Sequence, residues 1–437
     1  MKKTLSLLTL LFSAHAFSHG AVIEEEFFVA GRDQRVLEIL SAHPELTIDH
    51  VSDEGFEVYG PRGTEAYLSQ LNTLFYSIKS EEKNLDLDNY PSYPTITQKL
   101  QELAKKFPKI ARLESLGKTV QGRELWMMKI SDNAGVDEVE PEFKFISSMH
   151  GDEITGRELT LRLIEDLLES YGKDAAITEL IDNSELFIMP SMNPDGSEMR
   201  RRANANGVDL NRDFPEFTRN DQNNPQGRQP ETQAVMNFQK FRNFSLSANF
   251  HGGAVCVNYP WDARYDQHPF EPLVMEFSQA YADLNTPMRE SRQFRGGITN
   301  GAQWYVLRGG MQDWSYLWHN DLQVTIELSD AKWPQYSEIP KFYRDNKESM
   351  LKYIQLIHQG AGVRLSDRSA TGKVTILKGS QNLGTYGFQN GEFYKVLEPG
   401  QYTLQVEAMV NGQLLKKNVS AAVLKDFVET NGNFISL

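Results

Sequence analysis

Two histidines and a glutamate stand just after short apolar runs, and these residue types can bind a metal. His150 and Glu153 follow the run FKFIS within SSMHGDEITGRE, and His251 ends the run LSANF before Gly252 and Gly253. A three-residue spacing on a turn brings an imidazole and a carboxylate to the same side, as zinc requires of nitrogen and oxygen ligands. A His, Glu, His set leaves the fourth tetrahedral position to water, which is the layout of a catalytic zinc site. We therefore predict one Zn²⁺ per chain, held by these three residues.

The spacing of His150 and Glu153 is a weak signal by itself, because a chain with nine histidines and many glutamates contains such pairs by chance. Glu327 adds to it. This carboxylate lies in the middle of the apolar run VTIELSD, where burial is costly without a partner or a purpose. The alternative is a glutamate at the wet rim of a strand, facing solvent.

The segment MNPDGSEMRRRANANGVDLNRDFP is dense in Asn, Arg and Gly. Its composition is equally compatible with a solvated loop and with a functional one. A guanidinium binds a carboxylate or an oxyanion through two parallel hydrogen bonds. An enzyme that acts at the end of a peptide needs such a group for the terminal carboxylate.

Taken together, these segments resemble the zinc metallocarboxypeptidase family. The matching motifs are YPSYPTITQKLQELAKKFPKIARLESLGKTVQGRELWMMKIS, HGDEITGREL, NPDG, RANANGVDLNRDFP, HGG, NGAQWYVLRGGMQDWSY and TIELSDAKWP, in the family's order over roughly residues 91–360. The similarity is greatest to the regulatory carboxypeptidase N/E group, rather than to the digestive pancreatic group. It implies an α/β fold with a mixed eight-stranded sheet flanked by helices, and hydrolysis of the C-terminal peptide bond of peptides or proteins.

The resemblance also implies a role for each matching residue. His150, Glu153 and His251 match the zinc ligands, and Glu327 matches the general acid/base that activates the attacking water. The other matches are Arg202 for the oxyanion, Asn211 and Arg212 for the terminal carboxylate, Tyr305 as a mobile cover over the substrate, and Asp209 as the carboxylate that orients a zinc-binding histidine.

Two further positions bear on the substrate. In the resembling group, a preference for C-terminal Lys or Arg goes with an acid eleven residues beyond the second zinc histidine, and Asp262 has that position. Gln312, in GGMQD, matches a polar residue of the same pocket. A carboxylate at the base of a pocket favours a cationic side chain. The alternative is that Asp262 caps a surface turn in WDAR.

Two other functions stay open. A zinc amidohydrolase acting on cell-wall peptides would need the same ligands. A non-catalytic protein that binds C-termini would keep the fold but could lose the ligands or the glutamate. The sequence retains His150, Glu153, His251 and Glu327, which favours an enzyme.

The elements that must position these residues lie within residues 93–361, predicted as the catalytic domain. Apolar strands alternate there with helical stripes such as Ile96, Leu100 and Leu103, a pattern typical of a largely parallel or mixed sheet covered on both faces. Functional side chains are expected at the ends of such strands.

Two smaller domains are predicted around it. Residues 22–82 read as a small α+β unit, similar in layout to the activation segment of other metallocarboxypeptidases, and it could be an inhibitory pro-domain or an accessory domain. Residues 83–92 are polar with Pro91 and read as a linker. Residues 362–437 show short alternating strands and Gly turns, and they resemble the transthyretin-like β-sandwich that follows the catalytic domain in the same group.

Composition limits where the chain acts and what it binds. Residues 1–16 have the layout of a bacterial-type signal peptide, with Lys2 and Lys3 before an apolar run and small residues after it, so we expect a secreted or periplasmic protein. The run is too short to span a membrane, and a net charge of −14 argues against a nucleic-acid partner. A single cysteine, Cys256, excludes an intramolecular disulfide, and we interpret it as a buried, inert thiol. We expect a monomer.

Overall fold

The computed structural model describes residues 22–78, 89–219, 221–425 and 434–437 of the chain. The predicted signal peptide, residues 1–16, lies outside the described residues, and of the predicted linker only residues 89–92 are described.

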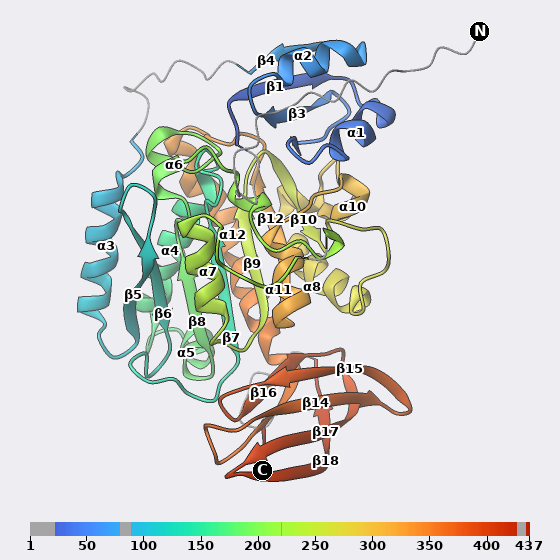
Figure 1. Ribbon diagram of the computed structural model, residues 1–437. Coiled ribbons are helices and arrows are strands. Elements are labelled where there is room, and N and C mark those ends of the chain that lie inside the picture. The colour runs from blue at the N-terminus through green and yellow to red at the C-terminus, as the bar shows by residue number, and fades with distance from the viewer. Residues whose placement is uncertain (1–21, 79–88, 220, 426–433) are drawn as a thin grey trace.

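The centre of the molecule is an eight-stranded mixed sheet with the strand order β11-β10-β12-β9-β7-β8-β6-β5 (Figure 1). Strands β8, β7, β9 and β12 are parallel neighbours in that order, and β10 is parallel to β11. The pairs β5–β6, β6–β8 and β10–β12 are antiparallel. The predicted fold class is confirmed. The strands are β5 Ala111–Lys118, β6 Glu124–Ile130, β7 Glu142–Ser147, β8 Glu185–Met189, β9 Phe244–His251, β10 Ala254–Tyr259, β11 Ile298–Asn300 and β12 Leu322–Ser329.

Helices cover both faces of this sheet, and β7, β8, β9 and β12 are buried at every position. On one face, the core is formed with α3 Tyr93–Lys106, α4 Thr155–Ser170, α5 Ala175–Asp182, α8 Glu271–Leu284 and α12 Ile339–Gln355. On the other face, a separate cluster is formed with α7 Pro230–Gln239 and α11 Met311–His319. The short helices are α6 Pro194–Met199, α9 Thr286–Arg289 and α10 Gly301–Trp304.

The carboxyl ends of β7, β9 and β12 meet at one edge of the sheet, because these three strands are parallel neighbours. His251 ends β9 and lies in register with Glu327 of β12. His150 and Glu153 lie in the turn between β7 and α4. Ligand sites of open α/β sheets form at this edge, so the topology itself gathers the residues that the sequence singled out.

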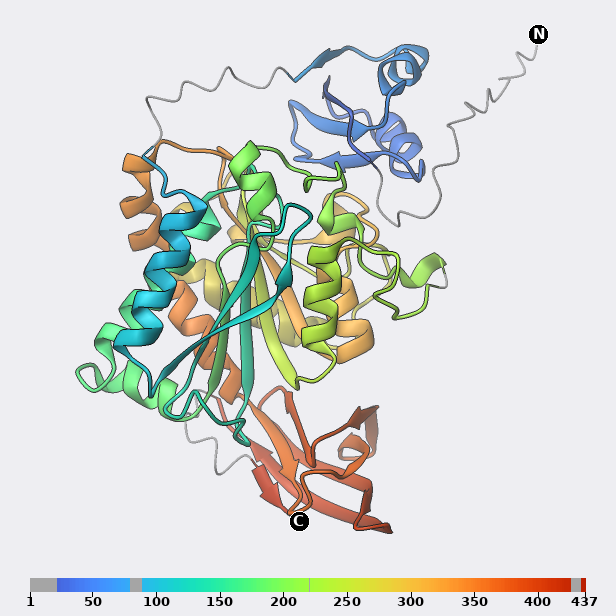
Figure 2. The same ribbon diagram turned by 60° about the vertical axis from the view of Figure 1, so that its left-hand side comes forward.

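The N-terminal unit, residues 22–78, is a four-stranded antiparallel sheet with the order β2-β3-β1-β4 and two helices on it. Its elements are β1 Glu25–Ala30, α1 Gln34–Ser41, β2 Thr47–Asp49, β3 Gly55–Gly60, α2 Thr64–Leu68 and β4 Phe75–Ser77. Its hydrophobic core continues into Trp304, Tyr305 and Leu307 of the catalytic region. The unit therefore packs over the carboxyl ends of the central strands (Figures 1 and 2).

The C-terminal part is a sandwich of a three-stranded sheet, β16-β13-β19, and a four-stranded sheet, β15-β14-β17-β18. Its strands are β13 Gly360–Arg364, β14 Thr371–Lys378, β15 Gln381–Phe388, β16 Glu392–Val396, β17 Gly400–Val410, β18 Gln413–Val423 and β19 Phe434–Ser436. It contacts the central sheet near the start of β9, where the amide of Val396 donates to Ser245 Oγ at 2.7 Å. The sandwich and the N-terminal unit thus lie at opposite ends of the molecule (Figure 1).

Among the residues that the structure describes, none of the helices combines the length and the apolar character needed to cross a bilayer.

Candidate zinc site and substrate cleft

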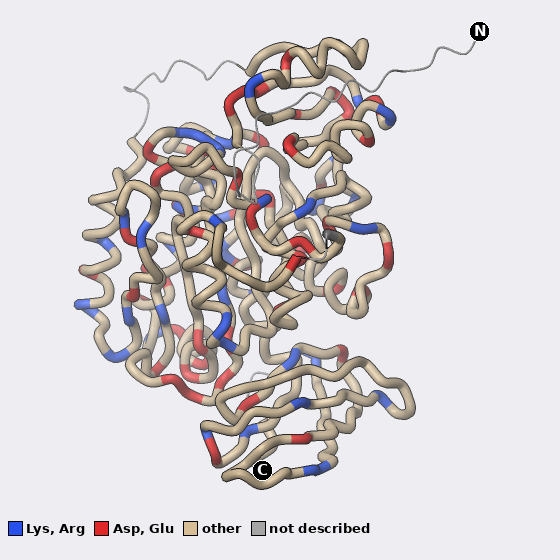
Figure 3. The backbone as a smooth tube through the Cα atoms, in the orientation of Figure 1, with Lys and Arg blue, Asp and Glu red and all other residues tan. Residues whose placement is uncertain are grey.

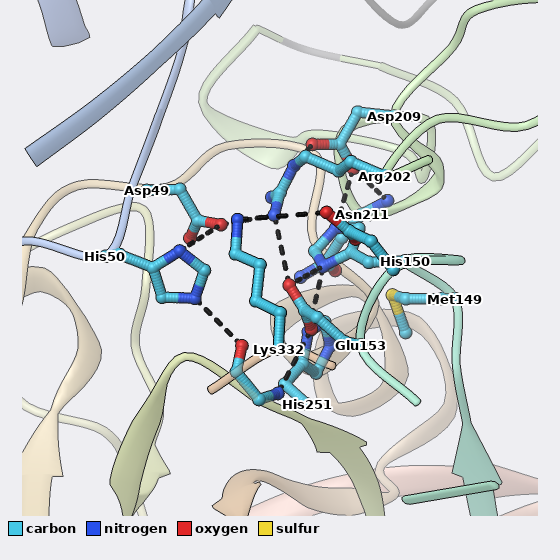
Figure 4. A network of polar contacts seen from close by, with 12 residues as sticks. Asp49, His50, Met149, His150, Glu153, Arg202, Asp209, Asn211, His251 and Lys332 are labelled. Atoms are coloured by element: carbon cyan, nitrogen blue, oxygen red, sulfur yellow. Dashed lines mark hydrogen bonds and ion pairs between the residues drawn. The ribbon is translucent and has the colours of Figure 1, made fainter. Parts of the chain in front are cut away.

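Three side chains converge at the carboxyl edge of the sheet (Figure 4). The Nδ1 atom of His150 lies 2.9 Å from Glu153 Oε1, and the Nδ1 atom of His251 lies 2.7 Å from Glu153 Oε2. The two Nδ1 atoms are 3.0 Å apart. All three residues are buried, with 2–4% of their surface exposed.

This arrangement fits a metal ion. Two imidazole nitrogens that face each other must share a proton or a cation, and the adjacent carboxylate of Glu153 favours the cation. Two nitrogens and a carboxylate are the donor set of catalytic zinc sites. On the far side of His150, Asp209 Oδ1 lies 2.9 Å from Nε2, so this carboxylate fixes the ring with Nδ1 facing the other ligands.

The turn that carries His150 and Glu153 depends on close packing. A Cβ atom at Gly151 would lie 2.1 Å from the backbone carbon of Gly196, so glycine is required at this point of the turn. The hydroxyl of Ser148 donates to the carbonyl of Glu153 at 3.1 Å and closes the turn. The spacing of the two ligands is therefore fixed by backbone contacts before any metal binds.

Glu327 faces the same centre from β12. Its side chain is buried, and its Oε2 atom has no hydrogen-bond partner among the described residues. The alternative of a solvent-facing glutamate at the sheet rim is wrong. Burial, and next the nearby Glu153 carboxylate, raise the pKa of Glu327 to about 8.

The Arg- and Asn-rich segment folds onto the site rather than forming a solvated loop. Arg202 donates from Nε to Asp209 Oδ2 at 2.8 Å and from Nη1 to Glu153 Oε1 at 3.2 Å. Asp209 also accepts the backbone N–H of Asn211 at 2.8 Å, which places Arg212 at the same cleft. The carboxylate of Asp209 thus contacts Arg202, the backbone of Asn211 and the imidazole of His150.

The N-terminal unit occupies this cleft, a feature that the sequence did not reveal. Asp49 forms a buried ion pair with Arg202, and its Oδ1 atom accepts the hydroxyl proton of Tyr305 at 2.8 Å. Arg212 Nη2 donates to the carbonyl of Ile48 at 2.9 Å. The groups expected to hold a substrate therefore hold the chain's own residues 48 and 49.

Further contacts hold the N-terminal unit in this position. Trp304 Nε1 donates to the carbonyl of Val51 at 2.7 Å, and Lys332 Nζ lies 2.6 Å from Glu57 Oε2. His50 places Nε2 at 2.8 Å from the carbonyl of Gly252, directly after a zinc-ligand position, and Nδ1 at 2.9 Å from Glu57. Because both ring nitrogens face oxygen acceptors, the docked ring is protonated on both.

The charges of this contact are mutually stabilising. Burial alone would raise the pKa of Asp49, but Arg202 and then His50 hold it at about 2. Burial alone would lower the pKa of His50, but Asp49 and then Glu57 raise it to about 9. Both ionised forms are therefore favoured while the N-terminal unit is docked.

A second group of polar atoms surrounds Asp262. Its Oδ1 atom accepts hydrogen bonds from Gln312 Nε2 and from Asn258 Nδ2, both at 3.0 Å. Asp313 accepts the backbone N–H of Asp262 at 3.0 Å, and Gly301 lies so close that a Cβ there would be 1.8 Å from Asp262 Oδ1. Asp262 is 3% exposed, so the alternative of a cap on a surface turn is wrong.

This buried group has hydrogen-bond acceptors in excess. Asn258 Oδ1 and Gln312 Oε1 are buried without a hydrogen-bond partner among the described residues. Burial, and next Asp313, raise the pKa of Asp262 well above its usual range. Asn258 and Asp313 were missed from the sequence, although Asn258 stands at the end of the apolar run AVCVNY, where functional residues were expected.

Cys256 of β10 is buried and belongs to the core shared with the N-terminal unit. It pairs in register with Glu327 on the antiparallel strand β12, so the two side chains lie on the same face of the sheet. Burial, and next the Glu327 carboxylate, raise the pKa of its thiol well above the usual range. These surroundings agree with an inert thiol.

Comparison with known proteins gives a consistent result. The profile of the zinc carboxypeptidase family matches residues 96–349. Human carboxypeptidase D is 40% identical over 345 residues, which cover 72% of this chain and 25% of that protein. Mouse carboxypeptidase M is 37% identical over 347 residues, covering 73% of this chain and 78% of that protein. The chain thus matches about a quarter of the length of carboxypeptidase D.

The fold agrees with solved structures. Carboxypeptidase A from Helicoverpa armigera superposes with a TM-score of 0.60 at 18% identity, covering 77% of this chain and 98% of that one. The family profile includes the turn of His150 and Glu153, the end of β9 with His251, and the strand of Glu327. On these grounds the chain belongs to the zinc carboxypeptidase family.

Proposed function

We propose that this protein is a zinc-dependent exopeptidase that removes the C-terminal residue of peptides or proteins, with a preference for Lys and Arg. The observation that carries the proposal is the combination of the convergent His150, Glu153 and His251 set with the buried carboxylate of Asp262, which we interpret as the base of the specificity pocket. Family membership supports the reaction class, and the pocket supports the preference.

The residues around the metal position have different roles in the proposed reaction. Zinc at this site supplies the Lewis acidity that lowers the pKa of the attacking water and polarises the scissile carbonyl. Glu327, with an otherwise unpaired Oε2, takes the proton of that water and returns it to the leaving amine. Arg202 faces the same centre and stabilises the negative charge that develops on the carbonyl oxygen.

The terminal carboxylate of the substrate binds Asn211 and Arg212. The Arg212 guanidinium already holds a carbonyl oxygen of the chain at 2.9 Å, so it can hold a carboxylate oxygen in the same place. Tyr305, buried against the N-terminal unit, would cover the substrate once that unit has left. A clamp on the terminal carboxylate explains why a single residue is removed.

The pocket chemistry favours a cationic terminal side chain. Among the described residues Asp262 forms no ion pair, and Asn258 Oδ1 and Gln312 Oε1 have no hydrogen-bond partner. An ammonium or guanidinium group would pair with the carboxylate and satisfy the two amide oxygens. A phenylalanine side chain would leave the carboxylate without a counter-charge and the two amide oxygens without partners.

The direct test is a panel of acylated dipeptides that differ only in the last residue, assayed with zinc removed and restored. We expect kcat/KM for Arg or Lys to exceed that for Phe by about 10²-fold, and Asp262→Asn to remove most of this preference. Asp266→Asn, a change of an exposed acid nearby, serves as the matched control. Equal rates on Phe and Arg would contradict the pocket assignment, and activity independent of zinc would contradict the mechanism.

We also propose that the docked N-terminal unit keeps the enzyme latent. Asp49 and the carbonyl of Ile48 engage Arg202, Tyr305 and Arg212, so a substrate cannot use these groups until the unit moves away. This favours an inhibitory segment over an accessory domain. Cleavage in the predicted linker, residues 83–92, followed by an increase in kcat/KM, is the expected result.

The two alternatives remain distinguishable. A cell-wall amidohydrolase would act on peptides that contain D-amino acids and would prefer them to Arg-terminated peptides. A non-catalytic binding protein would bind C-terminal peptides without turnover. Export to the periplasm or the exterior rests on residues 1–16 and is tested by N-terminal sequencing of the mature protein.

A further inference from the structure

The buried carboxylate of Asp313 holds the backbone of the segment that carries Asp262. Its Oδ1 atom accepts the N–H of Asp262 at 3.0 Å, and its Oδ2 atom accepts the N–H of Ala263 at 2.9 Å. Two successive backbone N–H groups thus bind the two oxygens of one side chain. Asp313 is 4% exposed, so water competes little with these hydrogen bonds.

The carbonyl groups of the same segment are held by other residues. The N–H of Ala302 donates to the carbonyl of Trp261 at 2.8 Å, and the N–H of Leu307 donates to the carbonyl of Asp262 at 3.0 Å. A buried backbone N–H that loses its acceptor is costly. Without the carboxylate of Asp313, the segment would therefore have to move until its two N–H groups found new acceptors.

The first turn of α11 contacts both ends of the proposed binding site for the terminal residue. The N–H of Met311 donates to Asn211 Oδ1 at 3.1 Å, and Gln312 Nε2 donates to Asp262 Oδ1 at 3.0 Å. Asp313, the next residue of this turn, holds the backbone of Asp262. The turn therefore sets the distance between Asn211, which we assign to the terminal carboxylate, and Asp262, which we assign to the terminal side chain.

The Asp262 carboxylate has little freedom to correct a displaced backbone. Asn258 Nδ2 donates to its Oδ1 atom at 3.0 Å, and a Cβ at Gly301 would lie 1.8 Å from the same oxygen. The direction of the carboxylate thus follows the position of its backbone. A misplacement of about 1 Å in such a site is enough to change a rate by about 10²-fold.

A preference for one terminal side chain has to come from local groups of this kind. Figure 3 shows acidic and basic segments interspersed over the catalytic region. Attraction between the net charge of −14 and a cationic peptide acts on the whole peptide, wherever its lysines and arginines stand. Only a carboxylate at a fixed distance from the terminal-carboxylate site reads the last residue.

Asp313 has to be ionised to accept both hydrogen bonds. Burial raises the pKa of Asp313 to about 7, whereas the backbone N–H groups of Asp262 and Ala263 act in the opposite direction. Its place in the first turn of α11 also favours the negative charge. At pH 8 the side chain is therefore an acceptor at both oxygens, and this is the pH for the test.

We propose that Asp313 is a positioning residue that fixes Asp262 relative to Asn211 and thereby sets the preference for Lys and Arg. It acts through the backbone of residues 262 and 263, without contact to the substrate. This inference rests on the proposed function, because it explains the preference that we assign to Asp262.

The experiment compares acylated dipeptides ending in Arg and in Phe at pH 8, on zinc-loaded full-length protein with and without limited proteolysis. Asp313→Asn replaces one acceptor oxygen by an NH₂ group, which cannot accept a backbone N–H. We expect the Arg-to-Phe ratio of kcat/KM to fall at least about tenfold from the wild-type ratio. Most of the change should be a higher KM for the Arg peptide, which a general loss of folded protein would not produce.

Asp321→Asn is the matched control, because Asp321 is another buried aspartate and pairs with Lys144. It precedes β12, at the opposite end of that strand from Glu327. This variant should lower Tm and leave the Arg-to-Phe ratio as in the wild type.

A wild-type ratio in Asp313→Asn would overturn the proposal, and so would an equal fall of the ratio in Asp321→Asn. A wild-type enzyme that does not distinguish Arg from Phe would contradict the proposed preference itself, so the two failures are separable. If Asp313→Asn does not fold, as judged by circular dichroism, Asp313→Ser is assayed in the same way, because it keeps a single acceptor oxygen. The same fall in the ratio is then expected, and an unchanged ratio refutes the role of Asp313.

Discussion

Replacing Asp49 by Asn tests whether the docked N-terminal unit keeps the site closed. The substitution removes the charge that pairs with Arg202 while it retains the shape of the side chain. A pKa of about 2 against an ordinary 3.8 corresponds to about 2–3 kcal/mol of docking free energy, at roughly 1.4 kcal/mol per pH unit. The side chain is 7% exposed, so solvent screening reduces this figure little.

That free energy corresponds to a change on the order of fifty-fold in the equilibrium between docked and open forms. If only the open form turns over substrate, the activity of full-length Asp49→Asn should rise by about ten- to fifty-fold over that of the wild type. Its upper limit is the activity of protein cleaved in the predicted linker. The wild-type active site is unchanged in this variant, so KM for the cleaved forms should be equal.

The assay is the initial rate with an acylated dipeptide ending in Arg, measured at pH 6.5 on zinc-loaded protein before and after limited proteolysis. Asp53→Asn is the matched control, because this acid of the same unit is exposed. The latency argument fails if intact wild type already has the activity of the cleaved form. It also fails if Asp49→Asn and Asp53→Asn have the same rate.

Three other predictions follow from the same site. Glu327→Gln should lower kcat by about 10²–10⁴-fold and leave the zinc content unchanged by elemental analysis, because the residue moves protons rather than binding the metal. Asp209→Asn should weaken zinc binding by about 10–100-fold in competition dialysis, since this carboxylate orients His150. His50 has a docked pKa of about 9 against an ordinary 6.5, so its contribution to docking is complete below pH 6.5 and is lost as the pH rises through 9. Latency, measured as the ratio of intact to cleaved activity, should therefore weaken between these pH values, and His50→Gln should remove that dependence.

The sequence was sufficient to single out residues that the structure brings together at the carboxyl ends of the strands, because each is marked by a local pattern. His150, His251 and Glu327 all adjoin or interrupt apolar runs, and such runs become the buried strands β7, β9 and β12. Parallel packing then brings the ends of these strands together. Arg202 and its neighbours lie in an irregular segment without hydrophobic periodicity. Their roles were therefore predicted from the family resemblance alone.

Other elements escaped detection for physical reasons. Strand β5 at the sheet edge is largely exposed and charged, so it lacks the apolar signature of the central strands. Strand β2 has three residues, too few to show an alternation. The pair of Asp49 with Arg202 joins residues 153 positions apart, and a single sequence contains no information on such register.

The double use of the cleft residues decides which variants can separate latency from catalysis. Arg202, Arg212 and Tyr305 hold the N-terminal unit through the same atoms that the proposed mechanism needs for a substrate. Any change in them weakens docking and turnover together, so a low rate in such a variant says nothing about latency. Asp49 and His50 contribute to docking alone. Only substitutions within the N-terminal unit can therefore weaken docking without loss of catalysis. A substrate must compete with that unit for Arg202, Arg212 and Tyr305.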